Sequence, residues 1–136
     1  MNVVVDTNRI IAALIKNGIS RRIIMDNKKF EFLIPDHSLI EVEKYREEIK
    51  QKAHISDQEF EVLLSLLLEK IEIIPKAEYE FCIDEARKLI PDIGDVPFLA
   101  LAIAVDAVGV WSEDAHFQKQ NKMRVLKTSD MVEELK

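Results

Sequence analysis

The chain has 136 residues, of which 48% are hydrophobic, and this is enough to bury the core of one compact domain. Its 25 acidic and 19 basic residues give a formal net charge of −6, which excludes a nucleic-acid binder that relies on an overall basic surface. No run of about 18 uncharged apolar residues occurs, so we expect a soluble, cytoplasmic protein with no membrane contact and no signal peptide. The single cysteine, Cys82, cannot form an internal disulfide and is expected to be a buried thiol.

Short apolar runs alternate with segments of helical periodicity along the chain. In chain order the pattern predicts strand 3–5, helices 9–16 and 19–27, strand 30–34, helices 37–51 and 57–70, strand 71–74, helices 77–90 and 96–106, strands 107–111 and 124–126, and helix 129–135. Helix 96–106 is apolar on nearly every side and should be the most buried. This alternation predicts an α/β/α sandwich with a central parallel sheet of about five strands. Without repeats or low-complexity tracts, residues 1–136 are expected to form a single domain.

Acidic residues follow the predicted strands at their carboxyl ends, where ligands bind in an open parallel sheet. They are Asp6 after the first strand, Asp36 and Glu41 after the second, Asp95 at the start of the apolar helix, and Glu113 and Asp114 after the fourth strand. Clustered carboxylates repel one another unless a cation neutralises them. Mg²⁺ or Mn²⁺ would do so, and both keep bound waters that can attack a phosphodiester. Zinc fits less well, because the three histidines and the one cysteine lack ligand spacing.

Each acid also has a purely structural explanation. Aspartate commonly caps a helix, and Ser-x-x-Glu matches a capping box. The candidate caps are Asp6, Asp95 before Val96-Pro97, Asp114, and the pair Ser38 and Glu41. His116 is interpreted as a surface or capping histidine, since its sequence neighbours give it no orienting partner. The joint occurrence of four acids at strand ends or adjoining helix starts favours the functional interpretation.

Four segments together resemble the PIN-domain family, in particular its small nucleases typified by the VapC toxins of toxin–antitoxin pairs. They are residues 3–8, 35–42, 92–102 and 111–117, and the likeness spans nearly the whole chain. It implies that Asp6, Glu41, Asp95 and Asp114 are the catalytic, metal-binding acids, with Asp92 as a further carboxylate and Asn8 and Ser112 as supporting groups. It also implies a Mg²⁺ or Mn²⁺ cofactor, an RNA substrate, a homodimer and an antitoxin protein as inhibitor.

Two positions bear on this resemblance. Glu113 stands where family members often carry a small or polar residue, and it is expected to add negative charge beside Asp114. Glu43 lies about 200° further around a helix than Glu41, so only one of the two should face the site, and the motif position favours Glu41.

The predicted function is therefore a metal-dependent endoribonuclease, the toxin of a toxin–antitoxin pair. The alternative is a non-catalytic module of the same fold that binds RNA or a protein. A phosphotransfer protein of the haloacid-dehalogenase type fits poorly, because its second aspartate would stand where the chain has Asn8. Neither a dinucleotide glycine fingerprint nor a Walker A loop is present.

Overall fold

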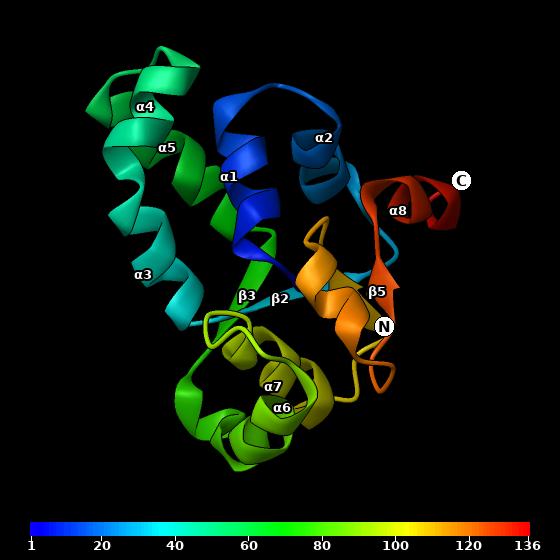
Figure 1. Ribbon diagram of the computed structural model, residues 1–136. Helices are drawn as coiled ribbons and strands as arrows, with labels where there is room; N and C mark the ends of the chain where they lie inside the picture. Colours follow the sequence, from blue (N-terminus) through cyan, green and yellow to red (C-terminus); the bar gives the residue numbers. More distant parts are fainter.

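A five-stranded, fully parallel sheet lies at the centre of the computed structural model, which describes residues 1–136 (Figure 1). Its strands are β1 (Asn2–Val5), β2 (Glu31–Pro35), β3 (Ile71–Ile74), β4 (Gly109–Trp111) and β5 (Val125–Leu126). Their order in the sheet is β3-β2-β1-β4-β5, and every neighbouring pair is parallel. The strand order therefore reverses between β1 and β4, which is the position where open α/β sheets bind ligands.

Helices cover both faces of the sheet, so the predicted α/β/α sandwich is confirmed (Figure 1). One face carries α1 (Thr7–Ile15), α2 (Ile19–Asp26), α3 (His37–Lys44), α4 (Arg46–Ala53), α5 (Asp57–Leu68) and α8 (Thr128–Glu134). The other carries α6 (Ile83–Leu89) and α7 (Val96–Ala104), preceded by the 3₁₀ helices η1 (Lys76–Glu78) and η2 (Glu80–Cys82). A third 3₁₀ helix, η3 (Ala115–Lys119), follows β4. None of the helices combines the length and apolar character needed to cross a membrane.

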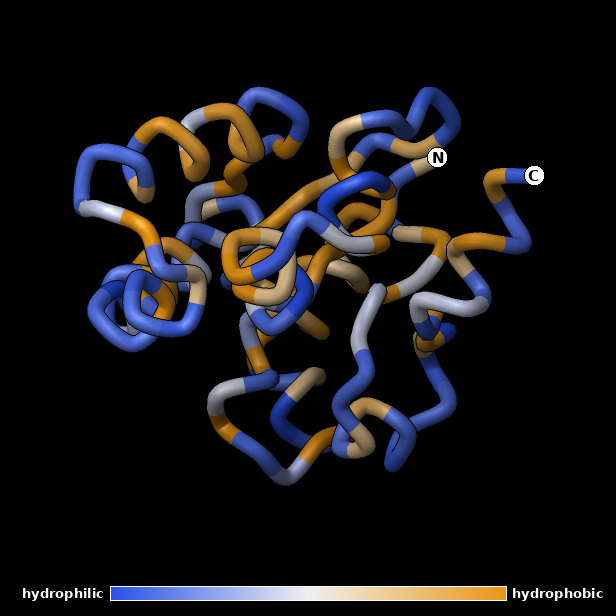
Figure 2. The backbone as a smooth tube through the Cα atoms, turned by 90° about the horizontal axis from the view of Figure 1, so that it is seen from above, coloured by the Kyte–Doolittle hydropathy of each residue, from blue (hydrophilic) through white to orange (hydrophobic).

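The central strand β1 shows why its sequence is an unbroken apolar run. Val3 and Val5 belong to the core on the α1 side, whereas Val4 belongs to the core on the α7 side. All three are completely buried. Because both faces of the strand are covered, no alternation with polar residues remains. In Figure 2 the hydrophobic segments accordingly run through the middle of the molecule, and hydrophilic residues occupy most of the outer turns.

Helix α7 is confirmed as the most buried helix. Six of its nine residues are buried, and Pro97 stands in its first turn, where the missing amide hydrogen leaves no hydrogen bond unmade. The helix packs against β1, β2 and β4 and reaches the carboxyl edge of the sheet through its N-terminus. Cys82 is buried against the same core, as expected for an inert thiol.

Two predicted helices are interrupted. The segment predicted as one helix over 37–51 breaks at Tyr45, which leaves helical geometry (φ −100°, ψ 10°) and both ends α3 and precedes α4. The segment predicted as a helix over 77–90 begins instead as η1 and η2. Tyr79 separates these two turns because its buried side chain is held by a 2.7 Å hydrogen bond from its hydroxyl to Asp36 Oδ1. Local periodicity cannot anticipate a partner 43 residues away.

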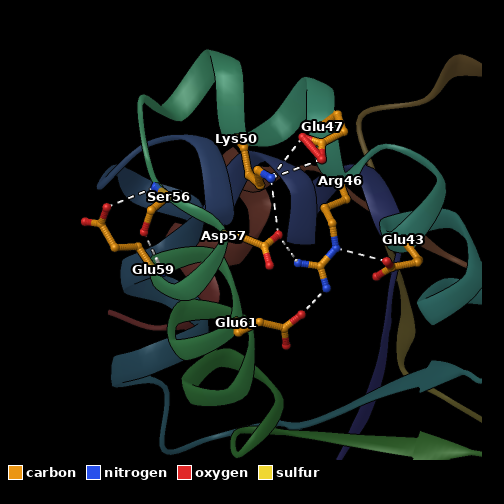
Figure 3. Close-up of polar contacts among 8 residues, drawn as sticks. All are labelled: Glu43, Arg46, Glu47, Lys50, Ser56, Asp57, Glu59 and Glu61. Atoms are coloured by element: carbon orange, nitrogen blue, oxygen red, sulfur yellow. Dashed lines mark hydrogen bonds and ion pairs between the residues drawn. The ribbon is translucent and has the colours of Figure 1, made fainter.

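A group of opposite charges joins α3, α4 and α5, and we call it the Arg46 cluster (Figure 3). The Arg46 guanidinium lies over the Phe60 ring at 4.5 Å. Its carboxylate partners are Glu43 (2.9 Å), Asp57 (2.8 Å) and Glu61, and the nearby Lys50 pairs with Glu47 (2.9 Å) and with Asp57 (3.2 Å). Every acid of this cluster therefore contacts a cation.

Candidate functional site

The four acids singled out in the sequence line one cavity at the carboxyl edge of the sheet. Its volume is about 380 Å³, and its lining includes Asp6, Asn8, Glu41, Asp92, Asp95 and Asp114. The acids come from the end of β1, from α3, from the start of α7 and from the segment after β4. A wider hollow of about 720 Å³ between α2 and α8 contains the Lys29–Glu134 ion pair and no such group of acids.

Asp6 is held at the point where the strand order reverses. Its backbone amide donates to the Trp111 carbonyl (3.0 Å), which extends the β1–β4 ladder by one residue. Its Oδ2 accepts a 2.7 Å hydrogen bond from the Ser112 hydroxyl, and Ser112 Oγ in turn accepts from the Asp114 amide at 2.9 Å. Asp6 is 5% exposed, and this burial raises the pKa of its carboxyl despite the bond from Ser112. Ser112 thus joins the acids after β1 and β4.

The Glu41 carboxylate is held by a hydrogen bond from a side chain of α1 and not by a capping box. Thr7 Oγ1 donates to Glu41 Oε1 at 2.7 Å, and Ser38 Oγ lies 2.7 Å from the same Thr7 oxygen. Ser38 is inside α3, whose first amide is capped by Asp36 through a 2.9 Å bond to His37 N, so the capping-box interpretation of Ser38 and Glu41 is wrong. Sequence reasoning also missed Thr7, whose only local signal is its place beside Asp6.

The two glutamates of α3 point in different directions. Glu41 lines the cavity. Glu43 does not line it, is 62% exposed and binds Arg46 (Figure 3). Asp36 is engaged elsewhere as well, because its carboxylate accepts from Tyr79 and from the backbone of His37 and Lys76. Only Glu41, among the acids after β2, is therefore free to serve the cavity.

Asp95 is the most perturbed acid of the cavity. It precedes α7 but makes no capping hydrogen bond, so its interpretation as an N-cap is not supported by its contacts. The residue is 9% exposed, and its Oδ2 is buried without any hydrogen-bond partner. Burial, together with the charges of Asp114, Asp92 and Asp6, raises its pKa to about 7. A buried carboxylate oxygen without a donor can be satisfied by a proton or by a cation.

His116 is the main residue whose surroundings the sequence did not reveal. Its Nδ1 lies 3.1 Å from Asp92 Oδ2, 3.5 Å from Asp95 Oδ2 and 3.4 Å from Asp114 Oδ1. The ring is 44% exposed, but Nδ1 itself is buried. The ring lies at the surface, as expected, but the expectation that it has no orienting partner is wrong, because its neighbours come from segments that are distant in sequence. Asp114, as expected, caps η3 by accepting from His116 N at 2.9 Å.

Glu113 does not add its charge to the cavity. Its carboxylate turns toward α8 and accepts a 2.7 Å hydrogen bond from the Thr128 amide. Partial burial would raise the pKa of Glu113, but hydrogen bonds from Thr128 lower it on balance. The expectation of extra negative charge beside Asp114 is thus corrected, since the side chain serves the start of a helix instead.

The donor set of the cavity fits a divalent cation. One oxygen each from Asp92 and Asp95 and Nδ1 of His116 lie within 4.8 Å of one another. No arginine or lysine forms an ion pair with Asp6, Asp92, Asp95 or Asp114, and the one lysine in the lining, Lys52, is paired with Glu48 at 3.0 Å. Oxygen-rich sites with several carboxylates bind Mg²⁺ and Mn²⁺, whose charge relieves the repulsion between the acids.

Comparison with known proteins gives a family and a fold. The sequence matches the PIN domain family over residues 4–135. A chain in the crystal structure of VapBC2 from Rickettsia felis, bound to a DNA fragment from their promoter, superposes with a TM-score of 0.72 and 20% sequence identity. The match covers 93% of this chain and 98% of that one. A search of curated protein sequences gives no significant match.

Proposed function

Because this chain belongs to the PIN-domain family, we propose that it is a metal-dependent endoribonuclease that acts as the toxin of a toxin–antitoxin pair. The observation that carries the proposal is the group of acids Asp6, Asp95 and Asp114 at the reversal point of the sheet, which pairs with no arginine or lysine. Like charges in a partly buried site oppose folding, so stabilisation of the fold does not account for such a group. A catalytic cation would account for it.

Asp6, Asp95 and Asp114, with Glu41 and Asp92 beside them, are the residues that would hold the ion. When bound, Mg²⁺ or Mn²⁺ would supply positive charge to the scissile phosphate and lower the pKa of a water molecule. Ser112 keeps Asp6 Oδ2 in place, and Thr7 does the same for Glu41 Oε1. Asn8 stands in the lining, where its amide can donate to a phosphate oxygen.

The RNA strand would enter past the wall made by α3 and α4. Tyr45 and Lys52 stand in that part of the cavity lining, and Tyr45 is 40% exposed. An exposed aromatic ring can stack on an unpaired base, and an ammonium group can contact a phosphate. The net charge of −6 makes binding depend on these local contacts and on the cation rather than on the general field of the protein.

An antitoxin protein and a second copy of the chain are the proposed partners. The likeness to a chain of VapBC2, a structure bound to a DNA fragment from their promoter, supports the first. Exposed apolar residues support a homodimer. Ile40 and Ile93 are 68% and 78% exposed and line one hollow between α3 and the start of α7.

The test is cleavage of mixed single-stranded RNA by the purified protein with Mg²⁺ or Mn²⁺, with and without chelator. We expect cleavage only with metal, and an Asp6→Asn variant should lose it. Glu41→Gln should reduce cleavage strongly, whereas its matched control Glu43→Gln should keep the wild-type rate. If no metal condition gives cleavage and Asp6→Asn binds RNA as tightly as the wild type, the protein is a non-catalytic binding module instead.

A further inference from the structure

The position of His116 is set by its own short helix. Phe117, the next residue, is completely buried and anchors η3 to the α7 side of the core. The His116 amide is tied to Asp114 Oδ1, so backbone and neighbour together hold the imidazole over the acids. Asp92 is oriented from the other side, because its Oδ1 accepts from the Gly94 amide at 2.9 Å and its Oδ2 is the atom that faces His116 Nδ1.

The spacing of these atoms is that of ligands around one ion. Mn²⁺ and Mg²⁺ hold their ligands at roughly 2.1 Å in octahedral geometry, so neighbouring ligand atoms lie about 3 Å apart. His116 Nδ1 lies 3.1–3.5 Å from carboxylate oxygens of Asp92, Asp95 and Asp114.

Two of these atoms also lack any other partner. Asp95 Oδ2 and His116 Nδ1 are both buried, and neither makes a hydrogen bond, although they lie 3.5 Å apart. Asp95 is 9% exposed, so water cannot freely replace the missing donor. A single cation between the two atoms would satisfy both, because imidazole nitrogen and carboxylate oxygen are both metal ligands.

We propose, building on the nuclease function above, that His116 Nδ1 joins Asp92 and Asp95 as a ligand of the divalent ion, and that this nitrogen makes the site favour first-row transition ions over Mg²⁺. Imidazole strengthens binding along the series from Mn²⁺ to Co²⁺, whereas Mg²⁺ prefers oxygen ligands and retains its waters. The cavity is then a mixed nitrogen and oxygen site rather than a cage of carboxylates alone.

The experiment uses the full chain and compares three variants with the wild type: His116→Asn, His37→Asn and His54→Asn. His37 is the other histidine close to a site acid, with Nε2 3.9 Å from Glu41 Oε1, and His54 ends α4 in a left-handed conformation (φ 57°) that asparagine tolerates. Melting of the metal-free proteins checks that each variant folds. Titrations with Mn²⁺, Co²⁺ and Mg²⁺ give affinities, and pulsed electron paramagnetic resonance of bound Mn²⁺ detects coupling to a nitrogen ligand.

We expect nitrogen coupling in the wild type, in His37→Asn and in His54→Asn, and none in His116→Asn. The Co²⁺ affinity of His116→Asn should fall about tenfold or more, and its Mg²⁺ affinity should change much less. Mn²⁺ that binds without nitrogen coupling while RNA cleavage persists would overturn the role of His116 and leave the nuclease proposal intact. A wild-type protein that binds none of the three ions would overturn both.

Discussion

Two groups of acids flank the α3–α4 segment, and they differ in what surrounds them. In the Arg46 cluster each carboxylate contacts Arg46 or Lys50 (Figure 3). In the cavity, Asp6 and Asp95 contact neither an arginine nor a lysine. Hydrogen bonding from Lys50 lowers the pKa of Asp57, whereas burial and neighbouring carboxylates raise that of Asp95 to about 7. Carboxylates therefore stabilise the fold in the Arg46 cluster and oppose folding in the cavity. This difference distinguishes a structural ion-pair cluster from a candidate functional site.

The strongest way to break this comparison is to neutralise one acid in each group. Asp95→Asn should lower the proposed metal-dependent RNA cleavage by at least about 100-fold, because a proposed ligand of the ion is lost. The same change should raise Tm in chelator at about pH 8 by about 3 °C, the shift that 1 kcal/mol gives in a domain of this size. Asp57→Asn should do the reverse, with unchanged cleavage and a lower Tm. Parallel effects of the two variants on Tm, measured by circular dichroism, would remove the distinction.

Adding a divalent cation should relieve the repulsion between the cavity acids and should leave the Arg46 cluster unchanged. A divalent ion at about 100 times its Kd stabilises the folded state by about 2.7 kcal/mol if it binds only that state. We expect Mn²⁺ to raise Tm of the wild type and of Asp57→Asn, and chelator to reverse the rise. Asp95→Asn should show little response. An equal rise in Asp95→Asn, followed by differential scanning calorimetry, would place the ion elsewhere.

The pH dependence should also be specific to the cavity. The folded pKa of Asp95 is about 7, above the ordinary value of 3.8, so between these values the folded protein holds a proton that the unfolded chain has released. Stability from this group is therefore full below about pH 4 and is lost as pH rises to about 7. In chelator, the Tm difference between Asp95→Asn and the wild type should widen across this window. A difference that stays constant with pH would contradict the raised pKa.

The smallest effect is expected from a change in the Arg46 cluster. Arg46→Met keeps an unbranched apolar stem over Phe60 but removes the charge shared by Glu43, Asp57 and Glu61. We expect a modest fall in Tm at about 0.05 M NaCl that shrinks at about 0.5 M, because salt screens exposed ion pairs. RNA cleavage should stay at the wild-type rate. Thermal melts at the two salt concentrations, with one cleavage assay, decide this.

Local sequence predicted those features that depend on neighbours along the chain. The apolar run of residues 3–5 indicated a strand buried on both faces, and the acid after it, Asp6, indicated the edge of the sheet where the acids gather. Features that depend on distant partners were missed. Ser38 matched a capping box but bonds Thr7, Glu113 reaches Thr128, and His116 meets Asp92 and Asp95. Each of these side chains bonds or contacts a residue from another segment of the fold. The periodicity of the local sequence does not reveal such partners.

The place of β1 in the sheet also has a consequence for synthesis. Strand β1 precedes the other four strands of the sheet in the chain and lies at its centre, flanked by β2 and, much later in the chain, by β4. The Asp6 carboxylate receives its hydrogen bond from Ser112, 106 residues further on. Until that segment leaves the ribosome, β1 has one open edge and the cavity lacks Asp114. A chain that lacks the segment after β4 therefore has an incomplete cavity, and the proposed activity requires that segment.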